Sequence, residues 1–242
     1  MMKHLTTTLL SLFILGSLNA QRNNKIKGNG NQVTIERTTK DYDQIAISGF
    51  FDIDLVEGKE GLLTLEGKQN ILDYIITEVN GKKLTIKVKN GYNLNPSSWG
   101  KKVSITIPVE SISALSLSGS GDIVGKKTLQ ADFFETSISG SGEITLALEV
   151  KSLKASMSGS GDMSLSGKAT DFDVSISGSG DINAYNLVAD YVDATVSGSA
   201  NVKVTANMKI NAKVSGSGDI DYRGNPEKIN TKVSGSGDIT MH

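Results

Sequence analysis

A six-residue phrase close to SGSGDI occurs seven times in the second half of the chain. Successive copies are separated by 18 to 21 residues, a short and nearly constant period that is typical of a solenoid. In a solenoid each unit contacts only its neighbours, so this repeat restricts the fold more than any other feature of the sequence. The copies begin at Ser118, Ser139, Ser158, Ser177, Ser197, Ser215 and Ser234.

Apolar and polar residues alternate with a period of two around each copy. In the fourth copy Phe172, Val174 and Ile176 share one parity with both glycines of the phrase, whereas Asp173 and the serines share the other. Alternate residues of a β-strand point to opposite faces, so we expect the apolar residues and glycines inside and the serines and acids outside. The inward glycines would let a wall bend or approach the opposite wall closely.

These patterns predict an all-β fold, a parallel β-helix (β-solenoid) with about 19 residues per coil. We expect two or three short strands in each coil, with equivalent positions stacked about 4.8 Å apart. The variable segments between copies, such as those at 166–171 and 185–190, are predicted to be turns.

The predicted organisation has three parts. Residues 1–20 place Lys3 and His4 before an apolar run and end on the small residue Ala20, which is typical of a cleavable signal peptide. Residues 21–110 are predicted to form an irregular β half that caps the solenoid, and residues 111–242 its regular coils. After the signal no stretch approaches the roughly 18 to 20 apolar residues that span a bilayer, so no transmembrane segment is expected after cleavage.

Within the N-terminal half several local elements are expected. The segment SGFFDI at 48–53 reads as a degenerate first copy of the repeat. Asn80 and Gly81 are predicted to form a two-residue hairpin turn, and a short helix is predicted around 68–73. Residues 90–100 are predicted to be the longest loop, which contains the only tryptophan, Trp99.

The signal segment, the N-terminal stretches ISGFFDIDLVEG (47–58), KLTIKV (83–88) and VSITIPV (103–109), and the stacked SGSGDI copies resemble one bacterial family. That family is called "putative auto-transporter adhesin, head GIN domain". The resemblance covers essentially all of the chain after the signal. It implies a right-handed β-helix at the cell surface or in the periplasm, and it brings no catalytic or binding residues.

Composition argues against several functions. The 25 Lys and Arg residues balance 26 Asp and Glu residues, so no nucleic acid partner is expected. The chain has no cysteine, and its two histidines are His4 and His242. This excludes Ser-His-Asp and Cys-His nucleophilic sites and zinc sites built on His or Cys clusters. No catalytic residue, metal site or cofactor is therefore predicted, although a polysaccharide-acting enzyme on a β-helix wall stays open as an alternative.

One outward acid recurs in nearly every coil, and we call this set the acidic column. A recurring acid is more typical of a solvated turn residue than of a catalytic pair. Calcium binding by stacked carboxylates is the alternative, but the chain lacks the G-G-x-G-x-D signature of calcium solenoids, and Asn201 interrupts the column. The column consists of Asp122, Glu143, Asp162, Asp181, Asp219 and Asp238.

The paired serines of successive copies are expected to form two exposed ladders, which we call the serine edge. A regular polar face of this kind could bind a glycan or a partner protein. The alternative is that serine occurs there only because it is the smallest soluble residue beside glycine. Tyr92 and Trp99 are the predicted aromatic contact points, with burial of Trp99 over the capping half as the alternative. The candidate binding residues are Ser118, Ser120, Ser139, Ser141, Ser158, Ser160, Ser177, Ser179, Tyr92 and Trp99.

The sequence therefore favours an exported, non-enzymatic scaffold in the periplasm or at the cell surface. Its predicted role is adhesion or ligand binding, with a surface glycan or an envelope protein as partner. A purely structural element is the third alternative, because the terminal coil DITMH (238–242) shows no evident cap and self-association through solenoid ends would cover it.

Overall fold

The computed structural model describes residues 24–96 and 102–242. It is nearly all β, with 75% strand and 2% helix. Sixteen strands belong to one sheet and the other two form a small separate sheet. The expected signal peptide, residues 1–20, lies outside the described residues. No helix among the described residues has both the length and the apolar composition needed to cross a bilayer.

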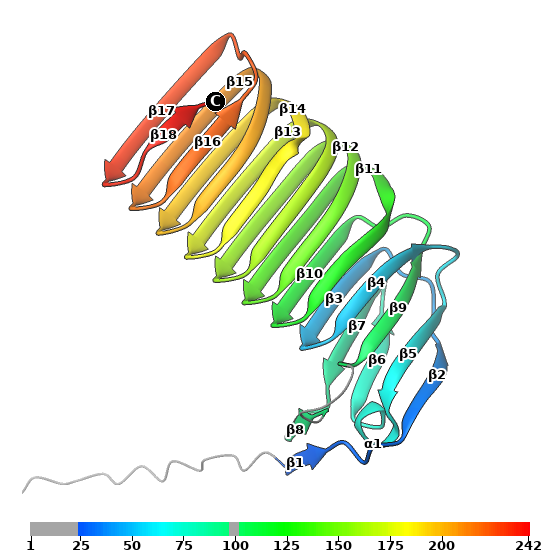
Figure 1. Cartoon of the computed structure of the whole chain (residues 1–242). Coiled ribbons are helices and arrows are strands. Elements are labelled where there is room, and N and C mark those ends of the chain that lie inside the picture. The colour runs from blue at the N-terminus through cyan, green and yellow to red at the C-terminus, as the bar shows by residue number, and fades with distance from the viewer. Residues whose placement is uncertain (1–23, 97–101) are drawn as a thin grey trace, which may run out of the picture.

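The repeats form a β-solenoid of about seven turns, about 19 residues apart (Figure 1). Each strand of this part pairs in parallel with the equivalent strand of the next coil, as predicted. The strands are β10 (Ala114–Gly119), β11 (Asp122–Gly140), β12 (Glu143–Gly159), β13 (Asp162–Gly178), β14 (Asp181–Gly198), β15 (Asn201–Gly216), β16 (Asp219–Arg223), β17 (Lys228–Gly235) and β18 (Ile239–Met241).

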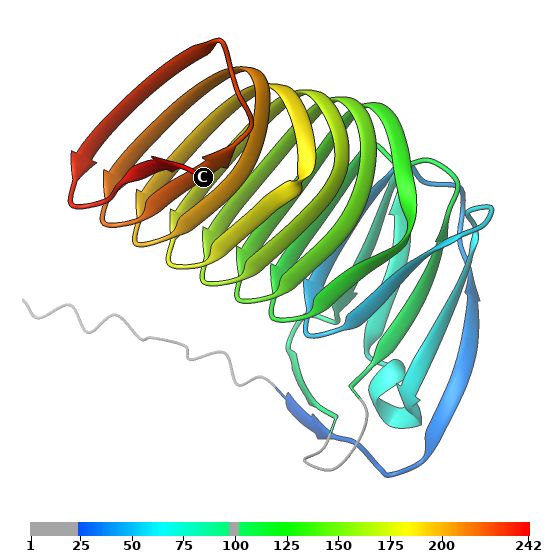
Figure 2. The same ribbon diagram turned by 45° about the horizontal axis from the view of Figure 1, so that its top comes forward.

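From β11 to β15 one continuous strand forms both walls of a coil, which corrects the expectation of two or three short strands there, whereas the last coil has two separate strands, β16 and β17. Residues 201–205 of β15 pair with β16, whereas residues 209–216 of the same strand pair with β17. The SGSG turns join the walls along one edge and a rounded bend joins them along the other (Figures 1 and 2). Pairing continues through the bend because register shifts absorb the differences in coil length, for example between Ser164 and Ser166.

The alternation of burial follows the predicted parity. Phe172, Val174 and Ile176 on β13 are buried, whereas Asp173 and Ser177 are exposed. Because equivalent positions are paired from coil to coil, each inward residue stacks on the inward residue of the next coil. The result is one continuous apolar core between the two walls.

The two glycines of each copy have different roles. The second, such as Gly180, is buried as predicted, whereas the first, such as Gly178, is half-buried and has a φ of +137°. A Cβ on Gly178 would lie 2.0 Å from the carbonyl oxygen of Gly159 in the preceding coil. The close approach is thus to the neighbouring coil, and not to the opposite wall as expected from the sequence.

The N-terminal half supplies the first coil. Ser48 pairs with Ser118 and Asp52 pairs with Asp122, so the segment SGFFDI is an in-register copy of the turn, as predicted. The elements of this half are β1 (Asn24–Lys27), β2 (Gln32–Thr38), β3 (Gln44–Gly49), β4 (Asp52–Glu57), β5 (Leu62–Lys68), α1 (Gln69–Leu72), β6 (Ile75–Asn80), β7 (Lys83–Val88), β8 (Tyr92–Asn95) and β9 (Ser104–Val109).

The outer side of the first coil is covered by strands that turn antiparallel. β7 pairs in parallel with β3 and then antiparallel with β6, while β9 pairs in parallel with β4 and then antiparallel with β5. β2 continues beyond β5, also antiparallel. These strands and α1 form the rounded body at the lower right of Figure 1. The division at residue 110 stays a prediction, since β3 and β4 pair directly with β10 and β11.

Three local predictions can be compared with the structure. The short helix is confirmed as α1. The hairpin between β6 and β7 is confirmed, but its two turn residues are Gly81 and Lys82, one position later than predicted, because Asn80 pairs with Lys83. The loop predicted over 90–100 is wrong for its central part, since residues 92–95 form β8 and pair with β1.

Candidate binding surface

The eight candidate serines lie where the sequence places them, along the tight-turn edge of the solenoid. The first serine of each copy is the next-to-last residue of a strand and pairs with its equivalent, as Ser158 does with Ser177. The second serine lies in the turn, where its backbone is fixed: the amide of Ser179 donates to the carbonyl of Gly159 at 2.9 Å. All eight side chains are exposed.

The hydroxyls of these serines are not used within the part of the chain that the structure describes. Among residues 24–96 and 102–242, none of the eight candidate hydroxyls makes a hydrogen bond to another residue, whereas Ser113 and Ser166, off the edge, do. A serine hydroxyl has one donor and two acceptor positions. The serine edge therefore presents a regular row of unused donors and acceptors to the outside.

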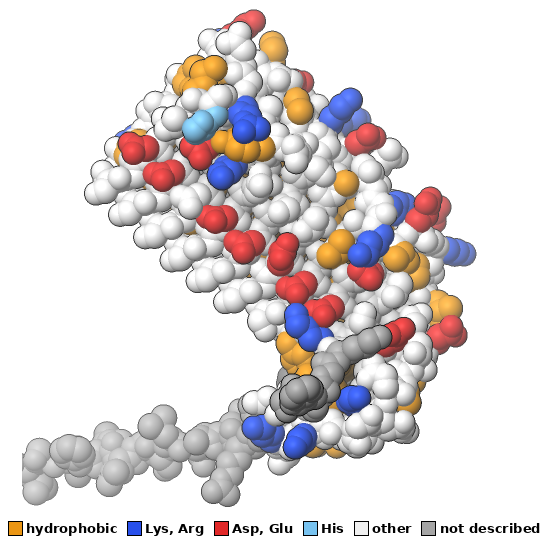
Figure 3. Space-filling view, viewed as in Figure 1, with side chains coloured by type: hydrophobic (Ala, Val, Ile, Leu, Met, Phe, Trp, Pro, Cys, Tyr) orange, Lys and Arg blue, Asp and Glu red, His pale blue; other side chains and the backbone are white. Residues whose placement is uncertain are grey.

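The acidic column runs beside the serine edge along one wall and forms the line of acidic side chains in Figure 3. Two of its carboxylates accept hydrogen bonds from the backbone of the next coil: the amide of Asp181 donates to Asp162 at 3.2 Å, and that of Asp238 donates to Asp219 at 2.8 Å. Asn201 does not interrupt the column. It donates to the Asp181 carboxylate at 2.9 Å and accepts from the Asp219 amide at 3.3 Å.

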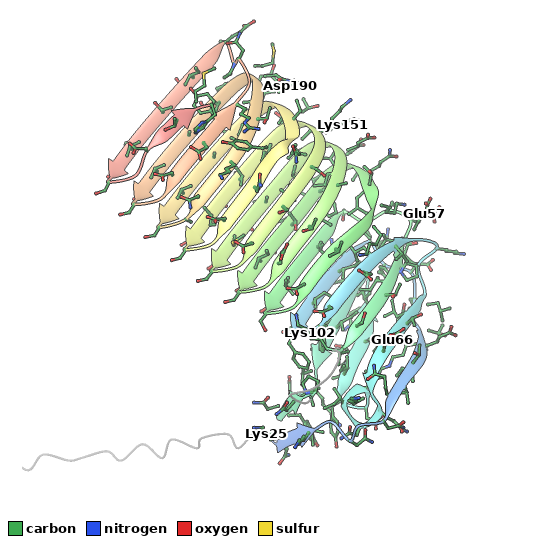
Figure 4. The ribbon with its side chains drawn as sticks, viewed as in Figure 1. Lys25, Glu57, Glu66, Lys102, Lys151 and Asp190 are labelled. Atoms are coloured by element: carbon green, nitrogen blue, oxygen red, sulfur yellow. The ribbon has the colours of Figure 1, made fainter. Side chains whose placement is uncertain are left out.

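A lysine joins the first two coils of the column. Asp52 extends the column by one coil, and Lys102 Nζ donates to Asp122 at 3.0 Å and to Asp52 at 3.2 Å (Figure 4). The hydrogen bond to Asp122, followed by that to Asp52, raises the pKa of the Lys102 ammonium. Because its side chain is about half exposed, this bridge is screened by solvent and stabilises the fold only weakly.

The middle of the column lines a shallow groove of about 360 Å³, which Glu143, Asp162 and Asp181 share with Asn183 and Lys203. In the described part of the chain no three Asp, Glu, His or Cys residues are placed to hold a metal ion together. Asp162 and Asp181 accept hydrogen bonds from the next coil, whereas Glu143 accepts the hydroxyl of Thr145 in its own coil.

Of the two aromatic candidates, only Tyr92 is described, and it does not lie at the serine edge. Tyr92 is half-buried on β8, in the small sheet formed with β1, and its ring packs on Tyr74 with 4.4 Å between centroids. The ammonium of Lys89 lies 5.7 Å from the same ring. Trp99 lies outside the described residues. Tyr92 is therefore a strand residue whose ring packs on Tyr74, and its role as a contact point stays a prediction.

A carboxylate cluster outside the repeat was the feature that an enzyme would require. Asp41, Asp43 and Glu60 line a hollow of about 310 Å³ near the first coil. Asp43 accepts the hydroxyl of Ser113 at 2.7 Å, and Glu60 accepts the amide of Glu110 at 2.8 Å. Two of the three carboxylates thus hold the chain segment that enters β10.

Two contacts on the wall that carries the acidic column could not be predicted from the sequence. Lys102 is separated from Asp52 by 50 residues and from Asp122 by 20, so only the folded chain brings the three together. Likewise, the Arg223 guanidinium lies 3.9 Å from the ring centroid of Tyr185, two coils away. Both contacts cross between coils at positions that do not follow the repeat.

The fold and surface define a two-walled β-solenoid with a serine-lined turn edge and a covered N-terminal end. A family model described as "Putative auto-transporter adhesin, head GIN domain" matches residues 41–226, and the chain belongs to this family. A comparison with curated proteins finds no match.

Solved structures share the fold. A Bacteroides fragilis protein described as "a putative adhesin" is 26% identical, has a TM-score of 0.81, and is matched over 90% of this chain and 100% of its own. A Parabacteroides distasonis protein described as "Putative lipid binding protein" is 27% identical with a TM-score of 0.75 and the same coverage. A Parabacteroides merdae protein described as "a putative adhesin", 20% identical over 90% of this chain and 99% of its own, has a TM-score of 0.72 and shows the fold alone.

Proposed function

We propose that the protein is an exported, non-enzymatic scaffold that binds a linear surface glycan along its serine edge. The observation that carries the proposal is the row of exposed hydroxyls that have no partner among the described residues, repeated in register from coil to coil. Membership of an adhesin family and the signal-like pattern of residues 1–20 support export and attachment.

The physical basis of the proposed glycan binding is the repetition of weak contacts along the serine edge. One hydrogen bond from a serine hydroxyl contributes a net free energy of only about 0.5 to 1.5 kcal/mol. A polymer with repeated hydroxyls can engage several coils at once, and each contact after the first is made at high effective concentration. A rigid solenoid suits such a ligand, because its hydroxyls are held in place before binding and lose little conformational entropy.

The proposal also assigns the carboxylates a structural role. Asp162 and Asp219 of the acidic column accept backbone amides of the next coil, and Asp43 and Glu60 accept hydrogen bonds from the segment before β10. A carboxylate committed to such bonds is poorly placed to transfer protons to a glycan. We therefore expect no cleavage of uronate-containing polysaccharides.

A triple lysine variant of the serine edge tests the proposal. Ser139→Lys, Ser158→Lys and Ser177→Lys replace hydroxyls on three successive strands and should weaken glycan binding and cell attachment by about tenfold or more. The matched control carries Gln130→Lys, Ser152→Lys and Thr170→Lys, which add the same charge to the same three strands away from the turn edge. The control should bind like the wild type on a glycan array.

Three results would contradict the proposal. The first is a wild-type protein that binds no glycan of the array, and the second is a serine-edge variant that binds and attaches as well as the control. The third is release of reducing ends from a uronate-containing polysaccharide, which would replace the scaffold by an enzyme. Retention of the protein on phospholipid vesicles but not on glycans would instead indicate that this chain binds lipid, the role named in the description of the Parabacteroides distasonis protein.

A further inference from the structure

The N-terminal end of the molecule gathers lysines. We call it the basic end, and it consists of the small sheet of β1 and β8, the helix α1 and the turns beside them, residues 24–32, 68–75 and 89–96. It lies at the lower end of Figures 1 and 2, and basic side chains are visible there in Figure 3. These segments contain one acid, Asp73, and four lysines: Lys25, Lys27, Lys68 and Lys89.

The pairing of β1 with β8 directs two of the lysines outward. Ile26 packs against the core and pairs with Leu94, which is buried. Lys25 and Lys27 flank Ile26 in the strand and therefore point away from the body. Both are exposed, and Figure 4 shows Lys25 at the lower end of the described structure. Asn70 of α1 donates to the carbonyl oxygen of Lys27 at 2.8 Å, which fixes β1 to the helix.

The other two lysines adjoin this sheet. Lys68 ends β5, and its Nζ donates to the carbonyl oxygen of Gly30, in the turn after β1, at 3.1 Å. Lys89 precedes β8, is exposed, and places its ammonium 5.7 Å from the ring centroid of Tyr92. All four lysines thus belong to one end of the molecule.

These lysines lack acidic partners. Among the described residues none of the four forms an ion pair. Burial lowers the pKa of the Arg37 guanidinium and the charge of Asp73 acts in the opposite direction, so Asp73 is offset by Arg37 rather than by a lysine. Glu66 on β5 lies away from Lys25 in Figure 4. The basic end therefore carries net positive charge. The lysines that do form ion pairs with acids are Lys87, Lys102, Lys126, Lys151 and Lys154.

The chain enters the basic end from the segment that resembles a signal peptide. Six residues lead from Leu18, the last residue of its apolar run, to Asn24, the first residue of β1. Six residues span at most about 20 to 22 Å. While such a segment is exported through a membrane, the basic end is therefore the part of the folded body nearest to that membrane. Its position and its charge both favour an anionic lipid surface as the partner.

We propose that the basic end docks the protein on the anionic headgroups of a phospholipid membrane. This inference does not depend on the proposed glycan role. Each lysine near an anionic lipid surface strengthens binding about fivefold, so several together can hold a peripheral protein there. The half-buried rings of Tyr74 and Tyr92 suit the headgroup region, where aromatic residues with a polar tip are favoured. In this orientation the coils extend away from the membrane (Figure 1).

Co-sedimentation with lipid vesicles tests the proposal. The purified protein should bind vesicles of equal parts phosphatidylcholine and phosphatidylglycerol about a hundredfold more tightly than vesicles of phosphatidylcholine alone, and high salt should release it. A variant that neutralises three exposed lysines of the basic end should bind the anionic vesicles about a hundredfold more weakly than the wild type. Its substitutions are Lys25→Gln, Lys27→Gln and Lys89→Gln.

The matched control removes three lysines of the coils that likewise form no ion pair among the described residues, and it should bind like the wild type. Its substitutions are Lys168→Gln, Lys209→Gln and Lys213→Gln on β13 and β15. A fluorescent dye locates the contact, because the chain has no cysteine of its own. A polarity-sensitive dye on Asn93→Cys, which pairs with Lys25, should shift to the blue when anionic vesicles are added. The same dye on Thr195→Cys, exposed on β14, should not shift.

Each contrary outcome overturns the proposal. Equal binding to neutral and anionic vesicles shows that the lysines do not hold the protein on the membrane. A basic-end variant that binds as tightly as the control, or a dye that shifts as much on Thr195→Cys as on Asn93→Cys, places the contact elsewhere on the molecule. Binding to heparin but not to vesicles makes the partner an acidic polymer and not a membrane. Circular dichroism of each variant confirms that the fold is intact.

Discussion

Replacing Gly178 by alanine should destabilise the protein by about 3 kcal/mol or more, or prevent the coil from forming. Its φ of +137° is a conformation that side chains rarely adopt, and the new Cβ would lie 2.0 Å from the carbonyl oxygen of Gly159. That oxygen also accepts the Ser179 amide at 2.9 Å, so the coils cannot separate without losing this bond. Denaturant unfolding followed by circular dichroism measures the loss.

Gly81→Ala is the matched control. Gly81 also has a positive φ, +61°, but a Cβ there would meet no atom within 4 Å. Its substitution should cost only about 1 to 2 kcal/mol, the price of a left-handed residue alone. Equal losses for the two variants would show that the contact between coils does not determine the need for glycine at the turn.

Phe134→Ala should lower the free energy of unfolding by about 3 to 5 kcal/mol, whereas Phe133→Ala should change it by less than about 1 kcal/mol. The two phenylalanines are neighbours on β11. Phe134 is fully buried and pairs with the buried Leu153, whereas Phe133 is 48% exposed and pairs with Ser152. Because the residue type and the strand are the same, the comparison isolates the direction of the side chain.

Similar losses for the two phenylalanine variants would contradict the assignment of inner and outer faces. A larger loss for Phe133→Ala would mean that the strand is inverted, with its polar face toward the core. Either result would also remove the serine edge from the outer surface, since the edge follows from the same parity.

The regular coils could be predicted because their information is local and repeated. The alternation of Phe172, Val174 and Ile176 with polar residues indicates that these three side chains lie on the inner face of the strand. This inference needs no knowledge of the neighbouring coil. The segment SGFFDI was recognisable as a first coil for the same reason. The length of each strand was not predictable, because whether pairing continues through a bend depends on how two coils of unequal length adjust to each other.

The rest of the molecule depends on contacts between distant segments. The antiparallel order of β2, β5 and β9 follows no repeat, and the bridge from Lys102 to Asp52 and Asp122 joins three separate stretches. The sequence predicts that Asn201 interrupts the acidic column, because asparagine has no carboxylate. In the structure its amide donates to Asp181 and accepts from the amide of Asp219, so the hydrogen bonds between coils continue through it. For the candidate site, the sequence predicted which serines are exposed but not that their hydroxyls lack partners.

A disulfide engineered between stacked serines tests the coil register most directly. The chain contains no cysteine, so Ser158→Cys with Ser177→Cys introduces a single pair at positions that face each other in β12 and β13. Their Cα atoms should be about 4.8 Å apart, within the range of a disulfide, whereas Ser158→Cys with Ser175→Cys separates them by roughly 8 Å. We expect complete oxidation of the first pair and little of the second. Cross-linking of the shifted pair, or of neither pair, would contradict the stacked coils.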